Sequence, residues 1–279
     1  MSDTPSHTPK DSHYARLRRA HREKTQGGPP AQGAVPDGLP DNTVRLYGLH
    51  TVQAALQNPK RRLHRLYATR NALARLGVGE DGLSCPFELV EPRFLDRELG
   101  GEAVHQGVML EARPLPPGRL SALGTANLVL VLDQVTDPHN VGAILRSATA
   151  FGAGAVVTTS RHSPQESGVL AKSASGALEH VPYIQIGNLA EGLTELAQRG
   201  YQTIGLDSEG PGELEPSFSG DKIALVLGSE GKGLRQKTRE TVSTLARLEM
   251  PGAIRSLNVS NAAAVALYAA RRHLGALSR

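Results

Sequence analysis

The sequence predicts a mainly parallel α/β fold over residues 121–279. Short apolar runs there alternate with segments whose apolar residues recur at helical spacing. The runs LVLVLD and KIALVLG are almost continuously apolar and do not alternate with polar residues, which is typical of parallel strands buried on both faces. With 279 residues, of which 39% are hydrophobic, the chain is long enough for one large or two modest domains.

The first 42 residues predict a solvated basic tail. They are polar and rich in Pro, Gly, Ser and His, and such a segment cannot bury enough apolar area to order itself. The tail could also serve as a loose electrostatic tether to RNA phosphates, which is compatible with the first interpretation. Its basic cluster consists of Arg16, Arg18, Arg19, Arg22 and Lys24.

Residues 43–115 predict a small α/β unit. A turn that continues into a helix is expected over residues 46–56, and the Pro-rich stretch 113–121 predicts a linker to the following domain. Strands are expected in LHRLYAT, FELVE and GVMLEA. A run of charges, Lys60, Arg61, Arg62 and Arg65, is either a solvated face or an RNA contact, and the sequence leaves both open.

Residues 121–279 predict a repeated strand–helix order. Strands are expected in LVLVLD, GAVVTT, VPYIQIG, YQTIGLD and KIALVLG. Helices are expected after the first strand, in KSASGALEH, in LAEGLTELAQRG, after KIALVLG and near the end of the chain. Ligands of such sheets bind outside the carboxyl ends of the strands, so the loops that follow the strands are the candidate site.

Composition excludes several classes of function. The single cysteine, Cys85, permits neither an intrachain disulfide nor a cysteine-based metal cage, which fits a reducing cytoplasm. The ten histidines include no pair at ligand spacing, so no metal site is expected. No apolar run is long enough for a membrane span, and the N-terminus lacks a secretory signal. Aromatic residues make up only 4%, which argues against base stacking on exposed rings, and the net charge of +4 is weak support for nucleic-acid binding.

The loop DPHNVGAILR places an unexpected arginine in a small-residue helix. Asn140 is the expected N-cap of this helix. Helical side chains lean toward the N-terminus, so Arg146 is expected to lean back over Gly142, which leaves room for it. An arginine that reaches solvent at the helix edge would explain Arg146 equally well when it is taken alone.

Two further loops carry an unusual pattern. LVLGSEGKGL has glycines between a strand and a helix, but their spacing matches neither the GxGxxG motif nor the P-loop pattern. Glu230 would also repel a phosphate at the start of the helix. The loop therefore predicts a site for a ligand without phosphates. A tight turn that binds no ligand would explain the glycines as well. In SLNVSN, polar residues crowd the start of an Ala-rich helix, with more capping capacity than one helix can use.

Together the three loops resemble the signature motifs of the SpoU/TrmH branch of the SPOUT RNA methyltransferases. Asn140, Gly142 and Arg146 match the first motif, and Gly228, Glu230 and Gly231 match the second. The third motif is matched by Met250, Gly252, Ser256, Leu257, Asn258, Val259 and Ser260. One departure is Leu248-Glu249 in place of the family's Ile-Pro, with Pro251 following the methionine. The resemblance is strong over 121–279 and weaker over 43–115, where YGLHTVQAAL and VHQGVML resemble the family's RNA-binding domain.

The resemblance implies a fold, a cofactor and partners. The domain at 121–279 would carry a C-terminal trefoil knot, and the domain at 43–115 would bind the RNA substrate. S-adenosylmethionine would bind in the knot, and the protein would form a homodimer with its active site near the interface. No metal and no membrane are implied. The cofactor pocket would be lined by Gly228, Leu248, Met250 and Leu257.

The implied reaction is methyl transfer to a ribose 2'-hydroxyl, with a guanosine of 23S rRNA as the substrate. In the family the arginine of the first motif is the proposed base. A guanidinium has a pKa above ~12 and does not deprotonate in proteins, so Arg146 is expected to bind the target phosphate and the 2'-oxygen as charge develops. Asn140 would position Arg146 or the ribose, Glu230 would orient Arg146 or an RNA group, and Ser256 and Asn258 would complete the site.

Four alternative functions are compatible with parts of the sequence. A tRNA 2'-O-methyltransferase keeps the chemistry, but the 43–115 domain favours rRNA. A resistance methyltransferase would act on a different rRNA loop. A non-catalytic RNA-binding assembly factor is disfavoured because both Arg146 and Glu230 are present. A nicotinamide dehydrogenase is disfavoured because GxGxxG and its downstream acidic partner are missing.

Overall fold

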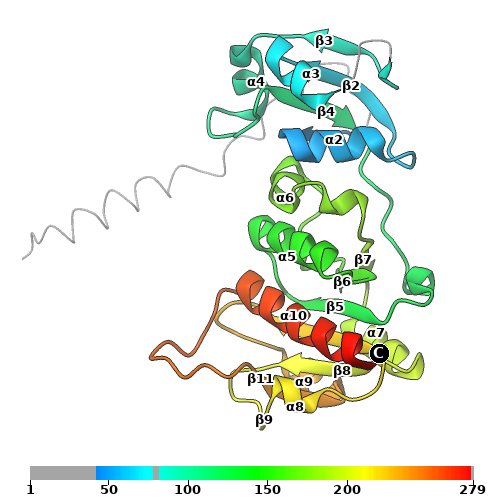
Figure 1. Ribbon diagram of the computed structural model, residues 1–279, viewed down its shortest axis with the longest axis vertical. Helices are drawn as coiled ribbons and strands as arrows, with labels where there is room; N and C mark the ends of the chain where they lie inside the picture. Colours follow the sequence, from blue (N-terminus) through cyan, green and yellow to red (C-terminus); the bar gives the residue numbers. More distant parts are fainter. Residues whose placement is uncertain (1–41, 78–81, 278–279) are drawn as a thin grey trace, which may run out of the picture. The chain divides into compact units, whose positions relative to one another are not determined.

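The computed structural model describes residues 42–77 and 82–277, and residues from Asn42 onward form one compact unit (Figure 1). The predicted basic tail lies outside the described residues, apart from Asn42. Two sheets make up the unit. We call them, with their helices, the four-stranded lobe (residues 44–112) and the seven-stranded lobe (residues 120–277).

The four-stranded lobe has the strand order β1-β4-β2-β3. Strand β4 is antiparallel to both β1 and β2, whereas β3 is parallel to β2. The three predicted strands are present, but the expectation of a turn before the helix was wrong, because residues 44–47 form a strand with Val44 and Leu46 buried. The strands are β1 (Val44–Tyr47), β2 (Leu63–Ala68), β3 (Phe87–Leu89) and β4 (Val108–Ala112).

Three helices accompany this sheet, and their ends follow from local sequence. Thr69 caps the second of them by accepting a hydrogen bond from the Ala72 amide, and Gly77 ends it in the left-handed conformation. Pro92 occupies the first turn of the third, where its missing N–H costs nothing. The helices are α2 (Leu49–Gln57), α3 (Arg70–Leu76) and α4 (Pro92–Leu99).

The seven-stranded lobe confirms the predicted parallel sheet. Its strand order is β7-β6-β5-β10-β8-β11-β9, and every pairing is parallel. Strands β9 and β11 and the short helix α8 were not predicted from the sequence. The strands are β5 (Leu128–Asp133), β6 (Ala155–Thr159), β7 (Tyr183–Ile186), β8 (Gln202–Leu206), β9 (Gly212–Glu213), β10 (Ile223–Gly228) and β11 (Thr244–Arg247).

Helices cover both faces of this sheet, as the apolar strands predicted. Alternate residues of β5 point to opposite faces: Leu130 packs in the cluster that contains α5 and α10, and Val131 packs in the one that contains α7. The helix predicted in KSASGALEH (residues 172–180) begins earlier, at Gly168, and ends at Ala174, because Ser175 is left-handed (φ 52°) and separates α6 from a 3-10 turn. The helices are α5 (Pro138–Ala150), α6 (Gly168–Ala174), α7 (Leu189–Gln198), α8 (Leu214–Ser217), α9 (Gln236–Thr241) and α10 (Val259–Leu277), with 3-10 turns η2 (Leu120–Leu123) and η3 (Ala177–Glu179).

Gly142 has a different role from the predicted one. A Cβ at this position would lie 2.5 Å from the Cβ of Ser173, 2.7 Å from the Leu170 carbonyl oxygen and 2.9 Å from the Ala174 amide nitrogen. The glycine therefore lets α5 and α6 approach closely, and the expectation that it makes room for Arg146 was wrong.

Gly142→Ala is expected to lower the free energy of unfolding by roughly 1–3 kcal/mol, because the new methyl group overpacks the α5–α6 contact. Chemical denaturation measures the effect. Gly275→Ala in α10 is the matched control: nothing lies within 4 Å of its new Cβ, so the helix-favouring residue should leave stability unchanged or slightly higher. Equal stability of the two variants would contradict the packing role of Gly142.

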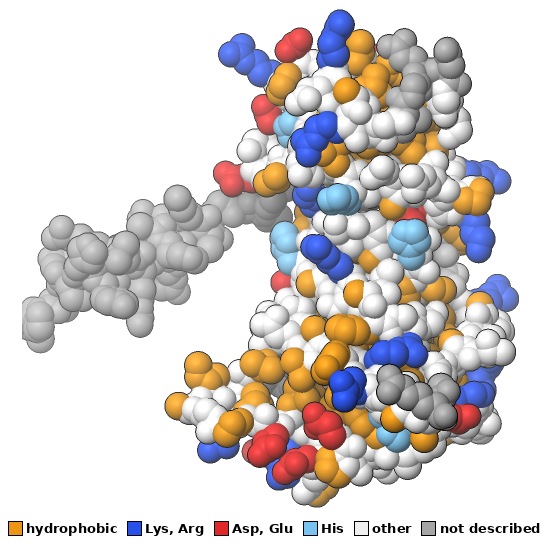
Figure 2. Space-filling model, in the orientation of Figure 1, with side chains coloured by type: hydrophobic (Ala, Val, Ile, Leu, Met, Phe, Trp, Pro, Cys, Tyr) orange, Lys and Arg blue, Asp and Glu red, His pale blue; other side chains and the backbone are white. Residues whose placement is uncertain are grey.

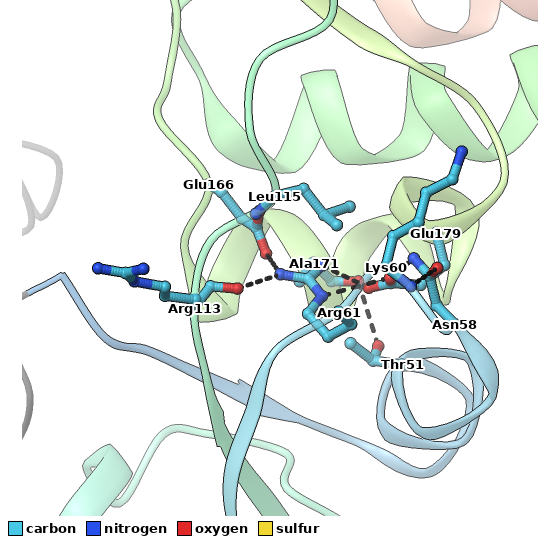
Figure 3. Close-up of polar contacts among 9 residues, drawn as sticks. All are labelled: Thr51, Asn58, Lys60, Arg61, Arg113, Leu115, Glu166, Ala171 and Glu179. Atoms are coloured by element: carbon cyan, nitrogen blue, oxygen red, sulfur yellow. Dashed lines mark hydrogen bonds and ion pairs between the residues drawn. The ribbon is translucent and has the colours of Figure 1, made fainter.

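Arg61 ties the two lobes together (Figure 3). Its side chain is fully buried, and its guanidinium forms ion pairs with Glu166 at 2.5 Å and with Glu179. Burial alone lowers the pKa of Arg61, but the hydrogen bonds and charges of the two carboxylates outweigh this effect and raise it. Both interpretations offered for the charge run were therefore wrong for Arg61, which is neither a solvated face nor an RNA contact.

The predicted linker is also held in place. The Arg113 carbonyl accepts a hydrogen bond from Arg61 at 2.9 Å, and the Leu115 amide donates to Glu166 at 2.7 Å. On the helix side, Asn58 donates to Glu179 at 2.6 Å and Thr51 donates to the Ala171 carbonyl at 3.1 Å. The junction is thus a polar network, which holds the lobes in one arrangement.

Candidate functional site

The three loops singled out from the sequence meet at the carboxyl ends of the parallel strands. One follows β5 and opens α5, one follows β10, and one runs from β11 to α10. Residues of the second and third loops line a pocket of about 250 Å³, together with the end of β8. This is the edge at which parallel sheets bind ligands.

All four residues expected to hold the cofactor line this pocket. They are Gly228, Leu248, Met250 and Leu257. Leu206 and Leu227 extend its apolar wall, and Glu230 and Ser256 from the catalytic set also face it. Leu248, which replaces the family's isoleucine, packs against the hydrophobic core, so the departure preserves an apolar wall.

Glycine is required in the loop after β10 for two reasons. A Cβ on Gly228 would overlap the backbone of Gly233, because the loop folds back and the Gly233 amide donates to the Ser229 carbonyl at 2.9 Å. Gly231 and Gly233 have positive φ angles of 78° and 63°. The backbone of the loop is therefore open to a ligand that approaches closely.

Two acidic residues of the site were missed by sequence reasoning. Asp133, fully buried at the end of β5, accepts hydrogen bonds from the Arg235 amide at 3.0 Å and from its Nε at 2.6 Å, which fixes the end of the glycine loop. Asp207 lines the pocket and pairs with Arg239. Both sit directly at strand ends, and that position was the only signal of their role in the sequence.

Asn140, Glu230 and Asn258 form a hydrogen-bonded cluster, which we call the polar triad. Asn258 donates to Glu230 at 2.7 Å and to the Asn140 side-chain oxygen at 3.0 Å, and Asn140 donates to Glu230 at 3.1 Å. Residues from all three loops are thereby joined at one point. The triad gives one residue of each motif a direct partner in the other two.

The triad also begins α10. The Asn258 side chain accepts hydrogen bonds from the Ser260 amide at 2.8 Å and hydroxyl at 2.6 Å, and Glu230 accepts one from the Val259 amide at 3.4 Å. A carboxylate at this position interacts favourably with the positive end of a 19-residue helix. The expected N-cap role of Asn140 was wrong: Asp137 caps α5, and Asn140 lies within its first turn.

Arg146 lies on α5 about two turns after its start and is exposed. It makes no hydrogen bond or ion pair with any residue in the described part of the chain, including Asn140 and Glu230. Ser256 lies in the pocket without a hydrogen bond to the triad. The structure thus joins three of the five expected catalytic residues and leaves the guanidinium of Arg146 available to a ligand.

Within residues 42–77 and 82–277, no group of three or more His, Cys, Asp or Glu side chains is placed to hold a metal ion. Among the same residues, no helix has both the length and the apolar character required to cross a membrane.

Comparison with known families matches both lobes. Residues 127–268 match the SpoU rRNA Methylase family, and residues 45–118 match the RNA 2'-O ribose methyltransferase substrate binding family. The 23S rRNA (guanosine-2'-O-)-methyltransferase RlmB of Ralstonia nicotianae is 40% identical over 81% of this chain and 94% of its own length. RlmB of Escherichia coli is 35% identical over 81% of this chain and 97% of its own length.

Solved structures agree in fold. The SpoU methyltransferase AviRb from Streptomyces viridochromogenes, determined with AdoMet, aligns with a TM-score of 0.71 at 20% identity, over 83% of this chain and 90% of that one. An AdoMet-bound rRNA methyltransferase from Sinorhizobium meliloti aligns with a TM-score of 0.69 at 18% identity, over 92% and 91%. Matched along most of its length by these relatives and by both family models, the chain belongs to the SpoU rRNA methylase family.

Proposed function

We propose that this protein transfers a methyl group from S-adenosylmethionine to the ribose 2'-hydroxyl of a guanosine in 23S rRNA. The observation that carries the proposal is that the second and third family motifs line one pocket, and that the polar triad joins the first motif to them through Glu230, which also lines that pocket. The names of the relatives, which are 35–40% identical over nearly their whole length, support the substrate.

The pocket fits S-adenosylmethionine by its chemistry. It offers apolar walls for an adenine ring and open backbone at the glycine loop. The Glu230 carboxylate faces the pocket, whereas its second carboxylate, Asp207, is already paired with Arg239. A carboxylate beside the loop favours a positive sulfonium and disfavours a phosphate. Gly228, Leu248, Met250 and Leu257 would hold the cofactor, which supplies an electrophilic methyl group when bound.

The residues around the pocket can assist the 2'-hydroxyl, which is a poor nucleophile until its proton is lost or shared. The free guanidinium of Arg146 would bind the target phosphate and stabilise the negative charge that develops on the 2'-oxygen. The polar triad of Asn140, Glu230 and Asn258 would hold the three loops together at the side of the pocket that faces the RNA. Ser256 would contact the ribose. The protein thereby orients the reacting groups, which supplies much of the catalytic effect.

The domain assignment follows the same proposal. Residues 43–115 would form the RNA-substrate-binding domain, and residues 121–279 the methyltransferase domain with a C-terminal trefoil knot. The matches over 45–118 and 127–268 support this division. The protein would act as a cytoplasmic homodimer, and a second copy would cover the exposed Val265 (46%) and Tyr268 (53%) of α10.

The test is methyl transfer from labelled S-adenosylmethionine to deproteinised 23S rRNA and, separately, to bulk tRNA. Label at one site of 23S rRNA is expected. Label on tRNA alone would overturn the rRNA assignment but keep the chemistry. Cofactor binding without transfer to either RNA, or to a ribosomal subunit precursor, would favour an RNA-binding assembly factor.

A further inference from the structure

A strip of polar side chains crosses the junction between the two lobes beside the triad. We call it the junction strip, and it consists of Gln106, Lys172, Ser173 and His139. Lys172 donates from Nζ to Gln106 Oε1 at 2.8 Å, and the Leu49 amide donates to the same oxygen at 3.1 Å. His139 Nδ1 lies 3.2 Å from the Ser173 hydroxyl, and His139 directly precedes Asn140 of the triad.

Lys172 is a cation that the described residues leave without a carboxylate partner. In this respect it differs from Arg61 and Arg235, which are each paired with acids. Partial burial lowers the pKa of Lys172, because desolvation disfavours the ammonium. An anionic ligand would remove that penalty.

The surroundings of Lys172 hold its ammonium at a defined position. Gly48, which directly precedes α2 and has a φ of 89°, leaves the space in which a Cβ would lie to Lys172 Nζ, so the ammonium packs against its backbone. Gln106 adopts a left-handed conformation (φ 57°), which is uncommon for a residue other than glycine and places its side chain against both donors. Because Gln106 Oε1 accepts both hydrogen bonds, its amide NH₂ remains available to a ligand.

The junction strip continues to Arg146. Helix α5 carries both His139 and Arg146, which lie about two turns and roughly 10 Å apart on the same helical face. Gly142 lies between them, where α5 touches α6 beside Ser173. Figure 2 shows His and Lys or Arg side chains over the region of α5 and α6, with few acidic side chains among them.

We propose that the junction strip binds the sugar–phosphate backbone of the RNA substrate and leads the strand from the four-stranded lobe to Arg146. The inference rests on the proposed function and adds the positioning residues that deliver the substrate. A phosphodiester fits the strip because it carries one negative charge for Lys172 and acceptor oxygens for the Gln106 amide and for His139. These contacts are independent of base identity, so they fix position and leave sequence recognition to other residues.

The experiment compares Lys172→Gln with Lys172→Arg and with Lys222→Gln in the full-length protein. Lys222 is the matched control, because it is also partly buried and bonded to a neutral carbonyl, that of Arg199 at 3.3 Å. It directly precedes β10 and so lies at the amino end of that strand, whereas the motif loops follow the carboxyl ends. The measurements are KM and kcat with 23S rRNA fragments, RNA affinity at several salt concentrations, cofactor affinity and Tm.

Lys172→Gln is expected to raise KM for RNA about fivefold while kcat at saturating RNA, cofactor affinity and Tm stay near wild type. Loss of one phosphate contact should lower the slope of log RNA affinity against log salt concentration by about 1. Between about 50 and 200 mM salt, the RNA affinity of the variant should therefore decrease by a factor roughly threefold smaller than that of wild type. Lys172→Arg should restore most of the affinity, and Lys222→Gln should match wild type.

Three outcomes would overturn the inference. The first is a salt slope and KM for Lys172→Gln equal to those of Lys222→Gln. The second is a lower Tm and weaker cofactor binding of Lys172→Gln with an unchanged salt slope, which would show that Lys172 has a purely structural role. The third is wild-type protein that transfers no methyl group to any RNA, which would refute the proposed function itself and is recognised without any variant.

Discussion

Arg146→Ala is expected to lower kcat for methyl transfer by roughly 10²–10³-fold while the Kd for S-adenosylmethionine stays within about twofold, since removal of one group that stabilises a developing oxyanion has an effect of this size. The structure supports the separation of the two effects. The Arg146 side chain is exposed on α5 and forms no hydrogen bond or ion pair with the described residues, whereas the proposed cofactor pocket is lined by other residues. Folding should be unaffected for the same reason.

Single-turnover kinetics and calorimetry measure the two quantities separately. Arg146→Lys tests the role of the planar guanidinium, because lysine keeps the charge but cannot form two parallel hydrogen bonds to a phosphate. We expect it to recover only a small part of the lost rate. Near-normal turnover of Arg146→Ala would remove Arg146 from the catalytic residues.

Arg61→Ala is expected to lower the free energy of unfolding by about 3–5 kcal/mol, which is the usual effect of removing one partner from a buried ion pair. The substitution would leave Glu166 and Glu179, with 8% and 3% exposed side chains, close together without a cation. It would also remove the hydrogen bond to the Arg113 carbonyl. Both lobes should therefore lose their fixed arrangement.

Denaturant titration of the full-length protein measures this loss. Arg62→Ala is the matched control, because the neighbouring side chain is exposed, and its removal should change stability by less than about 0.5 kcal/mol. An equal effect of the two substitutions would contradict the structural role of Arg61. Arg61 would then be interpreted again as part of a solvated face or of an RNA contact.

The central strands could be predicted because their sequence pattern reflects their burial. Every residue of β5, and all but the last of β10, is buried, so each strand appears as an apolar run. Strands β9 and β11 are half-buried and only two and four residues long, and they depend on pairing with distant segments. Nothing in their local sequence distinguishes them from loops.

The site could be predicted in part, through motifs and not through composition. The resemblance to the family identified residues that the structure brings into one pocket and one triad. Contacts that depend on tertiary structure were inaccessible: Asp133 pairs with Arg235 across 102 positions of the chain. Arg61 was misread because a run of charges gives no sign of which side chain is buried, and Gly142 because the pattern did not reveal the helix that packs against it.

The most direct test of the central claim is the identity of the methylated atom. We would treat 23S rRNA with wild-type protein and S-adenosylmethionine, identify the methylated nucleoside by mass spectrometry in one portion, and map alkali-resistant positions by partial hydrolysis in another, with Arg146→Ala in parallel. We expect 2'-O-methylguanosine at a single alkali-resistant position, and little of it with the variant. Methyl groups on a base, or on riboses at many positions, would contradict it.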